Sequence, residues 1–393
     1  MFAIFFDPLT IFDISEIQFV VNFCLFTNSI LHNYFVNTSG KVLFMFGERL
    51  HLARKSHGLS LRDLAAKTSN IVSAQAIGKY ENGLMMPSSE VLGALCQALD
   101  VSESYLLNSE TIQFEGAEFR KHSQVSKKEL AKLRATVLNH VSRYLEIETI
   151  LRIDSSICKL PTGFPERIQT LEAADNAAKE LRRVWQLGNQ PISNFPEILE
   201  ERGIKLLLLD LPSKVSGMTM KIQRVNGGTV LVIVLNATHS GERQRFSGGH
   251  ELGHNVLALA GLPDEEKPCH RFAGAFWAPA DTLYREVGER RQQISFDELF
   301  ALKKLFGLSI QALIYRMKDL GIISDGLFTD LFVDLSKRGW RKEEPKPVPR
   351  LESNRFNRLC LRAVAEGAIS PSKGAELLDV SIEQVENLLT ERM

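Results

Sequence analysis

Apolar residues between Met45 and about Leu107 recur at the three- and four-residue spacing of short amphipathic helices. Polar caps and glycines divide the pattern. Ser60 is a suitable N-cap, and Gly83 follows a predicted helix that runs from about Ser73 to Glu81. Short helices joined by tight turns are typical of a small all-α domain, which we predict over residues 45–107.

The elements become longer after this first domain. A long apolar stripe predicts one helix from Lys127 to Arg152, and a proline-containing stretch follows it. We therefore predict that residues 108–165 form a helical linker. Three apolar, partly β-branched runs then predict strands over Ile204–Leu209, Met218–Ile222 and Thr229–Leu235.

Helical patterns dominate the remainder of the chain. A helix is predicted from about Gly241 to Leu259, and further helices follow to Leu320. The segment 337–349 is basic and rich in proline, which indicates a linker. We predict a domain over residues 166–335 and a C-terminal helical domain over residues 351–393. The predicted fold class is mainly α, with one small α+β domain.

Composition narrows the functional classes. Lys+Arg and Asp+Glu both total 47, which argues against a polyanion-binding surface over the whole chain but leaves room for a small basic face. The five cysteines are scattered and form no Cys-x-x-Cys pair, so we expect a protein of the reducing cytoplasm without a disulfide framework.

The first 44 residues differ from the rest of the chain. They are rich in Phe, and Asp7, Asp13 and Glu16 interrupt their apolar runs. These charges argue against a signal peptide and against a membrane span, so we expect no membrane association. We predict that residues 1–44 are an unstructured extension and that Met45 is the true start of the protein.

The sequence His250-Glu251-Leu252-Gly253-His254 lies within a predicted helix. Residues four apart share one helix face, so the two imidazoles can bind one Zn²⁺ ion. Glu251 lies beside them and is the candidate general base for a hydrolytic reaction. Three fixed positions in five can also arise by chance, but the rest of this helix is apolar, where partnerless polar side chains would be costly.

A zinc site with an open position needs a third protein ligand. Glu266, on the next predicted helix, is the best candidate. His270 lies four residues after Glu266, so both side chains can point the same way. His270 is therefore either a rival third ligand or a partner that orients a metal-bound histidine.

The layout from Leu59 to Gly83 predicts a helix-turn-helix. In this motif the N-terminal part of the second helix enters the major groove of DNA. Ser73, Gln75 and Lys79 would face base edges and phosphates, and Arg62 on the preceding helix is placed for a phosphate. The alternative is a helical bundle used for dimerisation or partner binding.

These residues resemble two known families. Residues 45–107 resemble an Xre/Cro-type helix-turn-helix domain, through Leu61-Arg62-Asp63-Leu64-Ala65 and Ile77-Gly78-Lys79-Tyr80-Glu81-Asn82-Gly83. Residues from about 200 to 320 resemble the ImmA/IrrE metallopeptidases, through His250-Glu251-Leu252-Gly253-His254, Glu266 and Arg271-Phe272-Ala273. The chain departs from the second family at Cys269, where Ala is usual, and at His270, where Asn or Asp is usual.

The resemblance implies a zincin-like α+β domain in which His250, His254 and Glu266 bind zinc. It also implies that the chain is a DNA-binding transcriptional regulator, which we expect to act as a homodimer on double-stranded operator DNA. Its zinc endopeptidase domain would hydrolyse a protein target, such as a repressor. The alternative is a non-enzymatic repressor or antitoxin-like regulator, in which the peptidase-like domain is a sensor or a dimerisation module.

Overall fold

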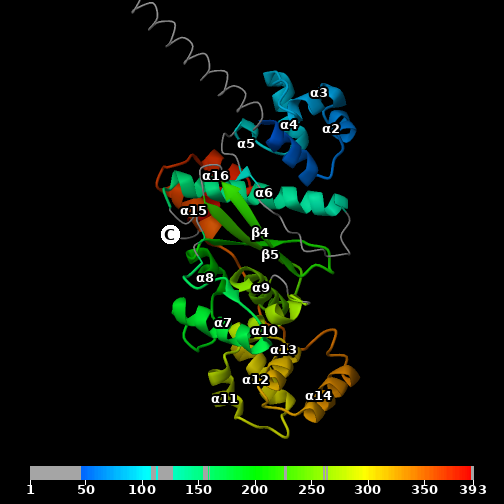
Figure 1. The fold of residues 1–393 in the computed structure, drawn as a ribbon. Helices are drawn as coiled ribbons and strands as arrows, with labels where there is room; N and C mark the ends of the chain where they lie inside the picture. The colour runs from blue at the N-terminus through cyan, green and yellow to red at the C-terminus, as the bar shows by residue number, and fades with distance from the viewer. Residues whose placement is uncertain are drawn as a thin grey trace, which may run out of the picture. The chain divides into compact units, whose positions relative to one another are not determined.

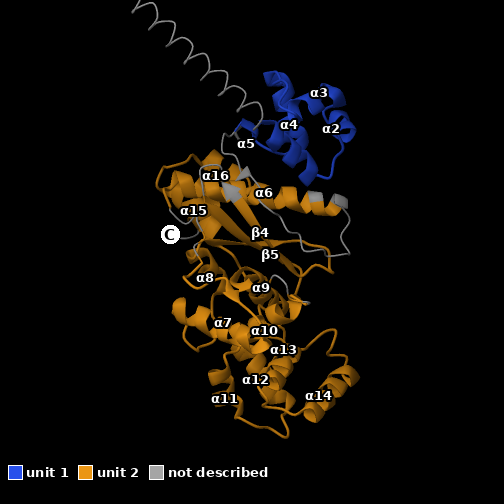
Figure 2. Ribbon diagram, viewed as in Figure 1, with its two compact units in different colours: residues 1–110 blue, residues 111–393 orange. Residues whose placement is uncertain are grey.

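A computed structural model describes residues 46–107, 112–113, 127–153, 158, 160–224, 228–259, 262 and 264–390 (Figure 1). The predicted extension over residues 1–44 and the choice between Met1 and Met45 lie outside these residues. The chain divides into two compact units, Met1–Glu110 and Thr111–Met393 (Figure 2). The predicted fold class is confirmed: the first unit is all-α, and the second combines many helices with two small sheets.

The described part of the first unit is a bundle of five short helices. They span residues 46–56, α2 (Leu61–Lys67), α3 (Ala74–Glu81), α4 (Ser89–Leu99) and α5 (Glu103–Leu107). Leu50, Leu64 and Ile77 are fully buried in its core. The Ser60 hydroxyl accepts a hydrogen bond from the backbone N–H of Asp63, and the Asp63 carboxylate accepts one from the Ser60 N–H. This capping box fixes where α2 begins.

A buried ion pair ties the first helix to the end of α3. Arg54 donates to both carboxylate oxygens of Glu81, at 2.6 and 2.7 Å. Burial raises the pKa of Glu81, but hydrogen bonds from Arg54 and His51 outweigh it and leave that pKa below the ordinary value. The pair therefore holds α3 against the rest of the bundle in its ionised form.

The second unit contains a four-stranded sheet in the order β1-β4-β5-β3. The central strand β5 (Thr229–Asn236) pairs parallel with β3 (Ile204–Leu209) and antiparallel with β4 (Gly217–Arg224). The short β1 (Ile112–Gln113) pairs antiparallel with the far end of β4. A separate parallel pair joins β2 (Glu166–Arg167) to β6 (Leu257–Ala258).

Two long helices carry the centre of this unit: α9 (Gly241–Val256) and α10 (Glu266–Trp277) pack against each other, and α9 also packs on β4 and β5. Leu252, Phe272 and Phe276 are fully buried in the core of this unit. The remaining helices around this core are α7 (Leu171–Val184), α8 (Phe195–Glu201), α11 (Ala280–Val287), α12 (Phe296–Phe306), α13 (Ile310–Asp319) and α14 (Asp325–Lys337).

The helix α6 (Lys127–Ile150), in the segment predicted as a linker, packs inside the second unit. Lys205 of β3 and Glu148 of α6 form a fully buried ion pair at 2.5 Å. α6 also packs against α15 (Arg355–Ala365), which packs with α16 (Pro371–Leu378) and α17 (Ile382–Thr390). No helix in the described part of the chain is long and apolar enough to cross a membrane.

The proline-rich segment after α14 is held against α9 by polar contacts. The Arg245 guanidinium donates to the Pro349 carbonyl at 2.7 Å, and the backbone N–H of Leu351 donates to Gln244 at 2.9 Å. Glu344 accepts from the ammonium of Lys303 at 2.9 Å. The segment is therefore a pinned strap across the start of α9, although its composition predicted only a linker.

Candidate metal centre

The position of α9 depends on two glycines before the histidines. A Cβ atom at Gly248 would lie 2.5 Å from the ring of Phe195, and one at Gly249 would lie 2.8 Å from the indole nitrogen of Trp277. Both aromatic side chains are buried. The glycines therefore let α9 approach these rings closely, and His250 is the next residue along the helix.

The helix places His250 and His254 on the same face. Their Nε2 atoms lie 3.0 Å apart, with the rings nearly perpendicular. Their side chains are 12% and 5% exposed, so both imidazoles are largely withdrawn from water. Two imidazole nitrogens that converge at this distance are arranged as a pair of metal ligands.

Glu266 approaches the same point from the first turn of α10. Its carboxylate oxygens lie 3.0 Å from Nε2 of His250 and 3.6 Å from Nε2 of His254. The Asp264 carboxylate accepts hydrogen bonds from the backbone N–H groups of Glu266 and Lys267, which fixes the start of α10. Hydrogen bonds from the two histidines hold the pKa of the Glu266 carboxyl far below its usual range.

The three side chains fit a zinc ion. Their ligand atoms form a compact group in which every pair lies within 4.8 Å. Zinc binds nitrogen and oxygen at about 2.0–2.2 Å, so adjacent ligands of a tetrahedral site lie about 3.3 Å apart. The observed separations of 3.0 to 3.6 Å bracket that value. Two nitrogens and one carboxylate are also the ligand set of many hydrolytic zinc enzymes.

His270 does not belong to this group of ligand atoms among the described residues. Its ring centroid lies 4.5 Å from that of His250 and 5.9 Å from that of Phe246, against which it stacks. Burial lowers the pKa of His270, and the nearby His250 lowers it further. Of the two third-ligand candidates, the structure therefore brings Glu266 to the histidine nitrogens and leaves His270 beside them.

A contact that the sequence did not predict involves Cys269. Its Sγ atom lies 3.0 Å from Nδ1 of His254, on the side of the ring opposite Nε2. The side chain is fully buried. A group that touches the second nitrogen of a metal-binding histidine fixes the ring's orientation and tautomer. The only sequence signal was that Cys269 departs from the residue usual in the related family.

Glu251 lies on the part of α9 that faces β4. It is buried, and a Cβ atom at Gly217 would come within 3.2 Å of its Cγ atom. Gly217 thus leaves room for the Glu251 side chain between helix and strand. Asn255 fastens the helix to the same strand, since its amide donates to the Thr219 hydroxyl at 2.7 Å.

The predicted DNA-binding residues all lie at the surface of the first unit. Arg62, Ser73, Gln75 and Lys79 are exposed, and Gln75 and Lys79 share one face of α3 because they lie four residues apart. The hydroxyl of Ser73 accepts a hydrogen bond from the Ala76 N–H, so this side chain caps α3. The structure thus presents an exposed polar face at the start of the second helix of the motif.

Comparison with protein families gives two matches. Residues 50–106 match the helix-turn-helix family model, and residues 199–318 match the IrrE N-terminal-like domain of peptidase family M78. The chain is a fusion of these two domain types. Neither the curated proteins nor the solved structures that were compared contain a match.

Both candidate sites of this fusion lie inside the matched segments. The IrrE-like match contains the whole metal centre and extends through most of α13, and the helix-turn-helix match contains Arg62, Ser73, Gln75 and Lys79. The protein is therefore a DNA-binding regulator, with double-stranded DNA as its partner, that carries a peptidase-like domain. The M78 match also indicates that the domain holds a metal.

Proposed function

We propose that the second unit is a zinc-dependent endopeptidase that hydrolyses a peptide bond in a protein target, and that this target is a transcriptional repressor. The observation that carries the proposal is the convergence of Glu266 with the Nε2 atoms of His250 and His254. This ligand set leaves a fourth position open, as in catalytic rather than structural zinc sites. His250, His254 and Glu266 would hold the ion.

When bound, zinc acts as a Lewis acid that polarises a carbonyl and lets water give up a proton near neutral pH. The Glu251 carboxylate takes that proton as general base and returns it to the leaving amine as general acid. Its buried position between α9 and β4 keeps bulk water away from the carboxylate. Cys269 would hold the His254 ring in place during the reaction.

The test compares wild type with Glu251→Gln on a peptide library prepared from a proteome, with mass spectrometry of the new termini. We expect both proteins to contain zinc. Removal of the general base should slow cleavage by about 10²- to 10⁴-fold. A repressor that contains a cleaved sequence is then tested as an intact protein. Equal cleavage by the two proteins would contradict the role of Glu251, and zinc without cleavage by wild type would favour a sensor domain.

The first unit would direct this activity to an operator as a homodimer. Gln75 and Lys79 lie on one exposed face of α3, where they would reach base edges and phosphates. Arg62 and Ser73 would contact the flanking sugar-phosphate backbone of the DNA. Selection from random duplexes should yield a two-fold symmetric site. On that site Lys79→Ala should reduce the slope of log affinity against log salt by about one if Lys79 contacts a phosphate.

A further inference from the structure

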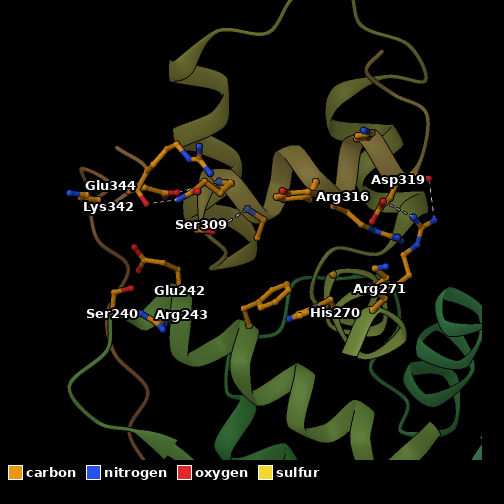
Figure 3. A pocket seen from close by; sticks show the side chains of 18 of the residues that line it. Ser240, Glu242, Arg243, His270, Arg271, Ser309, Arg316, Asp319, Lys342 and Glu344 are labelled. Atoms are coloured by element: carbon orange, nitrogen blue, oxygen red, sulfur yellow. Dashed lines mark hydrogen bonds and ion pairs between the residues drawn. The ribbon is translucent and has the colours of Figure 1, made fainter. Parts of the chain in front are cut away.

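A cavity of about 860 Å³ lies between α9, α10 and α13 (Figure 3). Side chains from α9, α10, α13 and the strap segment line it. Figure 3 shows Arg243 of α9 and His270 of α10 on one side of the cavity, with Ser309 and Arg316 on the other. Two of these elements, α9 and α10, also carry the candidate ligands.

The cavity lies along one face of α9 and approaches the metal centre, whose own residues do not line it. Arg243, Phe246 and His250 are spaced by three and four residues, which places them in line on that face. The ring of His270 contacts the rings of both Phe246 and His250. Since Phe246 and His270 line the cavity, it begins next to the His250 ligand. A chain bound across the metal centre can extend into it.

The acidic groups of the cavity all have partners among their neighbours. Asp319 pairs with Arg271 at 2.8 Å. Glu242 and Glu344 each accept from the buried ammonium of Lys303 at 2.9 Å. Glu344 also accepts hydrogen bonds from the backbone N–H groups at the start of α13. Because Glu242 and Glu344 share the single positive charge of Lys303, this group of side chains keeps one negative charge.

Three cations also line the cavity: Arg243, Arg341 and Lys342. Arg243 donates to the hydroxyl of Ser216, and the Arg341 guanidinium lies over the ring of Phe332. Within the part of the chain that the structure describes, neither these two arginines nor Lys342 has a carboxylate partner. Arg341 and Lys342 belong to the strap that is pinned to α9. These three cations outnumber the one surplus negative charge of Glu242 and Glu344, so the end of the cavity away from the metal centre carries a net positive charge.

We propose that this basic end binds an acidic side chain of the peptide substrate about three residues from the scissile bond. The proposal rests on the proposed peptidase function. Arg243 precedes His250 by seven residues, which is about 10 Å along a helix that rises 1.5 Å per residue. An extended peptide spans that length with three residues of about 3.3 Å each. The planar guanidinium of Arg243 matches the geometry of a carboxylate.

The first experiment uses the zinc-loaded full chain and pairs of fluorogenic peptides built on a site found in the library. Within each pair, the third residue on one side of the scissile bond is either Asp or Asn, and both sides are examined. We expect KM for the Asp peptide to be about tenfold lower on one side, the effect of one charge-assisted hydrogen bond. Arg243→Gln should remove that difference, and 0.5 M salt should reduce it.

A matched control is Arg183→Gln, which neutralises an exposed arginine of α7 whose partner is Glu180. It should leave the Asp preference intact. Equal KM values for the Asp and Asn peptides on both sides would overturn the proposed pocket while leaving the peptidase function standing. A preference that survives in Arg243→Gln would overturn it as well.

A second experiment remains decisive if no peptide is cleaved. The full-length Glu251→Gln variant is titrated into fluorescein-labelled nonapeptides on a Gly-Ser background that carry either one Asp or one Asn. Tighter binding of the Asp peptide, abolished by the additional change Arg243→Gln, supports the pocket even if the proposed catalysis fails. Equal anisotropy curves for the two peptides would overturn it.

Discussion

The close packing of α9 on its neighbours gives a sharp prediction for Gly248→Ala. The added Cβ atom would lie 2.5 Å from the Phe195 ring, about 1 Å inside the optimal carbon–carbon contact distance. The ring is 1% exposed, and its centroid lies 5.0 Å from that of Trp277, so it has little room to move. The strain therefore falls on α9 and on the histidine that follows.

Two opposing terms set the magnitude. Replacing glycine by alanine within a helix stabilises it by about 1 kcal/mol. Overpacking a filled core costs about 1–3 kcal/mol, and the blocked Phe195 ring places this site near the upper end. The net effect is a loss of about 1–2 kcal/mol of unfolding free energy. For a unit of this size, that corresponds to a fall in Tm of about 2–8 °C.

Gly274→Ala is the matched control on the partner helix. Its Cβ atom would meet only Cδ of Arg316, at an ordinary distance of 3.6 Å, so the helix-propensity term should prevail. Thermal unfolding of the full chain should therefore place Gly274→Ala above wild type and Gly248→Ala below it. A Gly248→Ala protein as stable as Gly274→Ala would refute the account of how α9 is seated.

The other predictions concern polar contacts. Cys269→Ala removes the group next to Nδ1 of His254 and should weaken zinc binding about 10- to 100-fold in a chelator competition; an unchanged affinity would show that the contact does not position the ring. The ion pair of Glu81 with Arg54 keeps the pKa of Glu81 in the folded state below 4.5. The ion pair therefore stabilises the fold above about pH 4.5, and this stabilisation is lost as the pH falls through the lower folded-state pKa. Glu81→Gln should cost about 3–5 kcal/mol at pH 7 and flatten the dependence of the first unit's Tm on pH between 5 and 3; a profile as steep as that of wild type would contradict this.

Much of the fold follows from local sequence signals. The strand Ile204–Leu209 has the predicted bounds, because its apolar run, interrupted only by Lys205, ends at Asp210. The prediction that the helix continues to Leu259 was wrong at its C-terminal end. The helix α9 ends at Val256, and Leu257–Ala258 form the short strand β6. That strand pairs with residues 166–167, a contact between distant segments that an apolar run in the sequence does not reveal.

The centre of the candidate site could be predicted because its spacing is helical. His250 and His254 face one point simply because they lie four residues apart. Spacing alone could not decide whether Glu266 or His270 is the third ligand, because both lie on one face of the next helix. It depends on how α10 crosses α9, and that crossing also creates the contact between Cys269 and His254.

The pinned strap shows another limit of sequence reasoning. Proline and charge over residues 337–349 indicate an irregular segment but not what it contacts. It is held by the buried Lys303 and by the side-chain amide of Gln244, which lie on helices far earlier in the sequence. The positive end of the cavity arises from this long-range contact, because the strap supplies Arg341 and Lys342.

Metal analysis of the purified full chain decides whether the second unit binds zinc at this site. We expect one zinc ion per chain in wild type, loss of that zinc in His254→Ala and in Glu266→Ala, and its retention in His270→Ala. The last variant is the matched control, since its ring lies beside His250 and outside the group of ligand atoms. Wild-type protein without metal, or zinc that is lost in His270→Ala but kept in Glu266→Ala, would contradict the site described by the structure.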